Sequence, residues 1–110
     1  FFNISHSGEW IACALANVPV GIDIQYHREI KLEQTARKIC TPQEWKLFVQ
    51  ADTEKEKKNI LFQIWTKKES YLKFTGDGIR RELCEISYEE CSFYQLTMPD
   101  EYSGTICVGK

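Results

Sequence analysis

One long helix, bounded by a start signal and a stop signal, constrains the fold of this chain more than any other feature. Thr53 and Glu56 form a capping-box pattern, in which a threonine and a glutamate bond to free N–H groups at the start of a helix. The helical pattern continues to about Phe74 and meets a stop in the run from Thr75 to Gly78. We therefore expect this helix to be the element against which the rest of the domain packs.

The rest of the chain predicts an α+β fold in a single domain over residues 1–110. Apolar runs and turn residues indicate strands at 1–5, 10–16, 20–25, 83–87, 91–98 and 102–108. The second of these is apolar on both faces, as in a buried central strand, and a turn signal after it predicts a hairpin with the third. Shorter helices are indicated at 31–39 and after a capping box of Thr41 and Glu44. We expect a mostly antiparallel sheet packed against the long helix and these shorter ones.

Charge and composition exclude several classes of protein. The chain has 110 residues and a net charge of −2, which argues against general binding to nucleic acid. Its longest apolar run is too short to span a membrane, and we expect no signal peptide. The five cysteines lack the spacing of a zinc site, so we expect reduced core thiols in a cytoplasmic protein.

A basic segment overlaps the long helix. Residues 55–81 hold eight lysines and arginines against three acidic residues, whereas the rest of the chain is acidic overall. Such a segment is either a solvated helix face or a site for a phosphorylated ligand. Lys68 falls inside the apolar stripe of the helix, where its ammonium must reach solvent or meet an anion. Glu69 and Lys73, four residues apart at the edge of the stripe, form either a plain surface ion pair or part of a site.

Two carboxylates are candidates for a metal site. Asp23 lies on the polar face of the alternating strand at 20–25, and Glu69 lies on the long helix. Together they are suited to hold Mg²⁺, which prefers oxygen ligands and keeps waters and phosphate oxygens as further ligands. Lys68, Lys73 and His6 are suited to neutralise phosphate charge around such an ion. Periodicity alone does not place Asp23 beside Glu69.

Three sequence blocks resemble the signature blocks of the Sfp-type 4′-phosphopantetheinyl transferases. They are FNISHSG at 2–8, VGIDI at 20–24 and WTKKESYLK at 65–73, in an order and with separations that fit the family. The resemblance implies the fold of these enzymes and their activity. They move 4′-phosphopantetheine from coenzyme A to a serine of an acyl or peptidyl carrier protein, with Mg²⁺, and release 3′,5′-ADP. Such carriers serve fatty-acid, polyketide and nonribosomal peptide biosynthesis.

The resemblance also implies roles for matching residues around the pyrophosphate of coenzyme A. Asp23 and Glu69 are expected to bind Mg²⁺, and Glu69 is expected to take the proton of the serine. Lys73 is expected to stabilise charge on the pyrophosphate and the leaving group. Lys68 is a further candidate on the phosphate side.

Other positions match the family less evenly. By resemblance, His6 and the neighbouring Ser5 contact the 3′-phosphate of coenzyme A. At Gln25 many members carry a glutamate as a further metal ligand, and here either the amide oxygen coordinates the metal or a water fills the position. His27 and Arg28, which follow, are expected to be surface residues.

The chain is shorter than the Sfp-type enzymes, which resemble two similar halves with coenzyme A between them. It matches the second half and begins with Phe1 rather than Met. We expect either an excerpt that lacks an N-terminal half or a single-repeat protein that forms a homo-oligomer, because half a cleft leaves an exposed apolar face. Two other hypotheses stay open: a non-catalytic remnant that binds coenzyme A or a partner, and a structural or interaction domain without a ligand.

Overall fold

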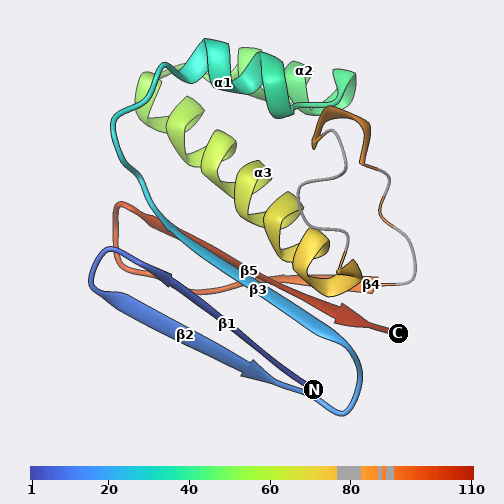
Figure 1. The fold of residues 1–110 in the computed structure, drawn as a ribbon. Coiled ribbons are helices and arrows are strands. Elements are labelled where there is room, and N and C mark those ends of the chain that lie inside the picture. The colour runs from blue at the N-terminus through green and yellow to red at the C-terminus, as the bar shows by residue number, and fades with distance from the viewer. Residues whose placement is uncertain (77–82, 87, 89–90) are drawn as a thin grey trace.

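The computed structural model describes residues 1–76, 83–86, 88 and 91–110, which have an α+β fold (Figure 1). β1 and β2 form an antiparallel hairpin, and β3, β5 and β4 form an antiparallel sheet in that order. The expected mostly antiparallel architecture is confirmed. In chain order the elements are β1 (Phe2–Ser7), β2 (Trp10–Leu15), β3 (Val20–Tyr26), α1 (Leu32–Ile39), α2 (Pro42–Gln50), α3 (Glu54–Thr75), the short 3₁₀ helix η2 (Leu83–Glu85), β4 (Cys91–Gln95) and β5 (Tyr102–Gly109).

Helix α3 lies over the sheet, with α1 and α2 on its far side (Figure 1). At its start the Glu56 N–H donates a hydrogen bond to Thr53 Oγ1 at 3.1 Å. At its end Gly76 adopts the left-handed conformation, with φ of 78°, which a residue with a side chain rarely adopts. The predicted start and stop of the helix are therefore confirmed, while Asp77 and Gly78 lie outside the described residues.

Strand β3 and helix α3 approach each other closely at Gly21. A Cβ atom at this position would lie 2.7 Å from Phe74 N and against Ser70 O. Only glycine allows the two backbones to come so near. Because side chains alternate along a strand, the face of β3 that contains Gly21 also contains Asp23 and Gln25. The contact thus turns the polar face of β3 towards α3.

The prediction of a central buried strand at 10–16 was wrong. β2 is an outer strand of the β1–β2 hairpin, and its residues Ile11 and Leu15 are 77% and 82% exposed. It pairs with β1 rather than with β3, because a two-residue turn at Gly8 and Glu9 folds it back, with Gly8 at φ of 58°. Ile11 and Leu15 therefore mark an exposed face of β2, whereas Ala14 on its other face is buried beside Val20 and Ile22.

Residues Leu83–Glu85 form a 3₁₀ helix rather than the predicted strand, and Ser87 lies outside the described residues. The Leu83 carbonyl accepts a hydrogen bond from Lys68 Nζ at 2.6 Å. This bond holds the segment against α3 instead of against the sheet.

The five cysteines are all free thiols, as expected. Cys40 and Cys107 are buried, but Cys13 is exposed on the hairpin, which corrects its assignment to the core. Across the described ranges, no helix is both long enough and apolar enough to cross a membrane.

Candidate functional site

The polar face of β3 centres on Asp23, which is only 9% exposed. Burial removes its carboxylate from water, and this raises its pKa from 3.8 to about 7. The positive charge of Lys73 lowers the pKa of Asp23 in part, and the negative charge of Glu69 raises it further. Asp23 is thus within electrostatic range of two side chains of α3.

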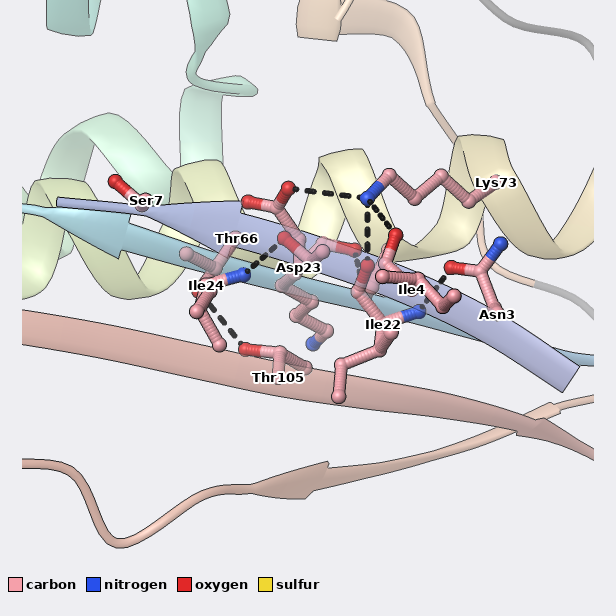
Figure 2. Close-up of polar contacts among 12 residues, drawn as sticks. Asn3, Ile4, Ser7, Ile22, Asp23, Ile24, Thr66, Lys73 and Thr105 are labelled. Atoms are coloured by element: carbon pink, nitrogen blue, oxygen red, sulfur yellow. Dashed lines mark hydrogen bonds and ion pairs between the residues drawn. The ribbon is translucent and has the colours of Figure 1, made fainter. Parts of the chain in front are cut away.

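Lys73 reaches from α3 to both β1 and β3 (Figure 2). Its Nζ lies 3.7 Å from Asp23 Oδ1 and donates hydrogen bonds to Ile22 O at 2.8 Å and Ile4 O at 3.3 Å. Three oxygens from two strands therefore fix the ammonium at the junction of β1 and β3. A lysine held in this way presents its positive charge at a defined place.

Glu69 lies one helical turn before Lys73 and is half-buried. Burial raises the pKa of its carboxyl group, and Lys73 lowers that pKa in part. Asp23, Glu69 and Lys73 thus form one cluster of two carboxylates and one ammonium, which we call the acidic–lysine cluster. The fold brings these residues together across a helix–strand contact that sequence spacing could not specify.

The acidic–lysine cluster fits a divalent cation with open coordination positions. Asp23 Oδ2 is buried and has no hydrogen-bond partner within the described ranges, which is costly for a carboxylate oxygen. Beside a second carboxylate, such an oxygen suits Mg²⁺. No group of three or more His, Cys, Asp or Glu side chains in the described part of the chain is arranged to hold a metal. A cation bound here would therefore take further oxygens from water or substrate.

Gln25 lies two residues after Asp23 on the same face of β3 and is half-buried. Its Nε2 donates a hydrogen bond to Tyr26 O at 3.3 Å. Gln25 is uncharged, so the negative charge available to a cation comes from Asp23 and Glu69.

The two residues predicted to contact the 3′-phosphate lie on opposite faces of β1. Ser5 is buried, and its Oγ accepts a hydrogen bond from Ile24 N–H at 3.0 Å. His6 is exposed on the outer face of the hairpin, opposite Ile11 of β2. The structure therefore uses the Ser5 hydroxyl within the fold and presents the His6 imidazole to solvent.

The structure places Lys68, which was predicted as a phosphate-side residue, inside the fold. Its side chain is 0% exposed, and Nζ forms an ion pair with Glu44 Oε1 at 2.8 Å. The same Glu44 oxygen accepts a hydrogen bond from Thr41 N–H at 2.8 Å and completes the capping box of α2. Lys68 does meet an anion, as its apolar surroundings require, but the anion belongs to the protein itself.

His27 was wrongly predicted to lie on the surface, whereas Arg28 is exposed as predicted. The His27 ring stacks on Phe62 with centroids 4.6 Å apart, and its Nε2 lies 2.7 Å from Ser103 Oγ. Burial and the charge of Lys58 lower the pKa of His27, which favours the neutral ring. The sequence offered no signal for this packing, because the partners of His27 come from distant parts of the chain.

The sequence of this chain is similar to those of known proteins. A family model described as the 4′-phosphopantetheinyl transferase superfamily matches residues 19–105. The chain is 41% identical over 78 residues to the 4′-phosphopantetheinyl transferase gsp of Aneurinibacillus migulanus. This aligned region covers 71% of this chain and 32% of that protein. It is 33% identical over 104 residues to the 4′-phosphopantetheinyl transferase Sfp of Bacillus subtilis (strain 168). This aligned region covers 93% of this chain and 46% of that protein. The chain thus spans less than half the length of both relatives.

The fold is also similar to that of a solved structure. The crystal structure of the Thermotoga maritima holo-[acyl-carrier-protein] synthase (AcpS) matches with a TM-score of 0.67 and 15% identity, over 84% of this chain and 63% of that one. At this level of identity the likeness concerns the fold alone, and it supports the α+β arrangement described above.

Proposed function

Because the chain belongs to the 4′-phosphopantetheinyl transferase superfamily, we propose that it moves 4′-phosphopantetheine from coenzyme A to a serine of a carrier protein. The observation that supports this most strongly is the acidic–lysine cluster of Asp23, Glu69 and Lys73. Reaction at a pyrophosphate depends mainly on positioning the reacting groups and neutralising negative charge. Two carboxylates and a fixed ammonium at one helix–strand contact suit both tasks.

In the proposed reaction, the carrier serine oxygen bonds to the phosphorus that bears phosphopantetheine. The bond from that phosphorus to the oxygen of 3′,5′-ADP breaks. Glu69 accepts the serine proton, directly or through a water, and burial makes it a stronger base than an exposed carboxylate. Lys73 stabilises the charge that develops on the leaving group. Asp23 and Glu69 would hold Mg²⁺, and as a Lewis acid the bound ion would neutralise negative charge on the pyrophosphate.

The outer face of the β1–β2 hairpin suggests what completes the ligand site. Phe2, Ile4, Ile11 and Leu15 on this face are 68%, 51%, 77% and 82% exposed. Contiguous exposed apolar side chains mark an interaction surface. We propose that a second domain-sized unit covers this face, either a preceding half of a longer chain or a second copy, and that coenzyme A binds beside it with His6 towards its 3′-phosphate. The free cysteines agree with a reducing compartment such as the cytoplasm.

Mass spectrometry of an apo carrier protein incubated with this chain, coenzyme A and MgCl₂ tests the proposal. We expect the carrier to gain one phosphopantetheine group, and Glu69→Gln to lower the rate by about 10²-fold or more. Glu54→Gln is the matched control, because Glu54 is an exposed carboxylate in the first turn of the same helix. A folded parent chain that transfers nothing, and that coenzyme A with Mg²⁺ does not stabilise against heat, contradicts the proposal.

A further inference from the structure

Strand β1 is joined to β3 by side chains rather than by a backbone ladder. Three β3 amides at alternate positions each donate a hydrogen bond to a polar side chain of β1, and the pairs keep a constant separation of 19 residues along the chain. The bonds are Ile22 N–H to Asn3 Oδ1 at 2.9 Å, Ile24 N–H to Ser5 Oγ at 3.0 Å and Tyr26 N–H to Ser7 Oγ at 2.9 Å. We call this row the side-chain seam.

The Asn3 end of the seam meets the Lys73 ammonium (Figure 2). The Ile22 N–H donates to Asn3, and the Ile22 carbonyl accepts from Lys73 Nζ at 2.8 Å. Ile4, the next residue after Asn3, supplies the second carbonyl that accepts from Lys73 Nζ, at 3.3 Å. Asn3 therefore fixes the separation of the two strands at the point where both carbonyls hold one ammonium.

Loss of the Asn3 acceptor would leave the Ile22 N–H without its hydrogen-bond partner. Ile22 is 2% exposed, so its N–H would be left with little access to water. A buried N–H without a partner costs more than the hydrogen bond itself contributes, so the strands would shift to relieve it. A shift of β1 separates the Ile4 carbonyl from the Ile22 carbonyl and releases Lys73.

We propose that Asn3 is a positioning residue, whose amide oxygen sets the two carbonyls that hold the Lys73 ammonium. The geometric part of this proposal stands on the hydrogen bonds alone. Its consequence for turnover rests on the function proposed above, in which Lys73 stabilises the leaving group.

Three variants separate positioning from general destabilisation. Asn3→Leu removes the acceptor and keeps the number and branching of the side-chain heavy atoms, and Asn3→Asp restores an oxygen at the same place. Ser7→Ala is the matched control, because it removes the same kind of bond, also 2.9 Å long, at the end of the seam away from Lys73. All three are compared at a temperature where each is folded by circular dichroism.

The first readout is the rate at which acetic anhydride acetylates Lys73, measured by peptide mass spectrometry against an exposed reference, Lys38. We expect Asn3→Leu to raise the relative rate at Lys73 by about threefold or more, because the amine loses the carbonyls that restrain it. Ser7→Ala and Asn3→Asp should stay near the parent rate. An unchanged rate in Asn3→Leu, or an equal rise in Ser7→Ala, overturns the proposal whether or not the chain has transferase activity.

The second readout is the transfer reaction. We expect Asn3→Leu to lower kcat by about tenfold while KM for coenzyme A changes by less than about twofold, because misplacing a catalytic group affects the transition state more than binding. If the parent chain transfers nothing, the proposed function fails while the acetylation result still decides the role of Asn3. If Lys73 is acetylated faster in Asn3→Leu but kcat is unchanged, Asn3 does position Lys73. That result overturns the proposed consequence of this position for turnover.

Discussion

At the scale of single residues, burial of the Asp23 carboxylate lowers the stability of the fold but provides a candidate metal ligand. A carboxylate at 9% exposure with one oxygen unpartnered in the described structure is a poor choice for folding alone. The sequence predicted Asp23 and Glu69 as metal ligands with Lys68, Lys73 and His6 around them, because residue type and motif indicate chemistry. It could not predict the partner of Lys68, because periodicity gives burial and not which distant side chain supplies the opposite charge.

The raised pKa of Asp23 predicts a pH dependence of stability. Its folded pKa of about 7 exceeds the ordinary 3.8, so between these values the unfolded chain has lost a proton that the folded chain retains. The free energy of unfolding contributed by this group therefore falls as pH rises through that window. Asp23→Asn removes the effect, and we expect the metal-free variant to gain on the order of 1–2 kcal/mol over the parent above pH 7.

Urea unfolding in EDTA at several pH values checks this prediction. The difference between parent and Asp23→Asn isolates Asp23 from Glu69, whose pKa is raised in the same direction. A parent that becomes steadily more stable than the variant as the pH is raised from about 4 to 7 contradicts the assigned environment of Asp23.

At the scale of elements, the caps of α2 and α3 were predictable because they depend on local sequence. The pairing of the strands was harder to predict from the sequence. An apolar run such as that of β2 is equally consistent with a central strand and with an exposed face, and only the turn at Gly8 decides which neighbour it meets. The seam of Asn3, Ser5 and Ser7 has a visible signal, a polar residue at every second position, but its acceptor role depends on where β3 lies.

The contact of β3 with α3 predicts a large effect at Gly21. Gly21→Ala places a methyl group against the backbone of Ser70 and Phe74, which cannot move aside as a flexible side chain would. We expect a loss of about 2–4 kcal/mol in the free energy of unfolding, since overpacking usually costs 1–3 kcal/mol and backbone contacts are the least forgiving. Gly76→Ala, where nothing lies within 4 Å, serves as a comparison with conformational strain alone.

Urea denaturation of both variants measures these losses. If Gly21→Ala is no less stable than Gly76→Ala, the close approach of strand and helix described here is incorrect.

At the scale of the whole molecule, the described residues combine a packed contact of α3 with the sheet and an open apolar face on the hairpin. The first explains why an α+β domain was predictable from this sequence. The second explains why β2 was misjudged, because apolar residues that await a covering surface have the same composition as residues already in a core. The two relatives named above are more than twice as long as this chain, which fits this picture.

The open face predicts association in solution. We expect the isolated chain to self-associate at micromolar concentration, and Ile11→Lys to weaken this because a charge on the face opposes burial. Sedimentation velocity measures the effect, with Lys46→Glu on exposed α2 surface as the control. A parent chain that stays monomeric at all accessible concentrations removes the argument that the hairpin face binds a second unit.

Whether Asp23 and Glu69 hold one divalent ion together is tested most directly by paramagnetic broadening. Mn²⁺ is added with coenzyme A to ¹⁵N-labelled protein, and amide signals are followed by NMR. The account predicts selective broadening of residues 22–24 and 68–73 in the parent, and its loss in both Asp23→Asn and Glu69→Gln. Broadening centred elsewhere, or unchanged in either variant, contradicts a shared cation site.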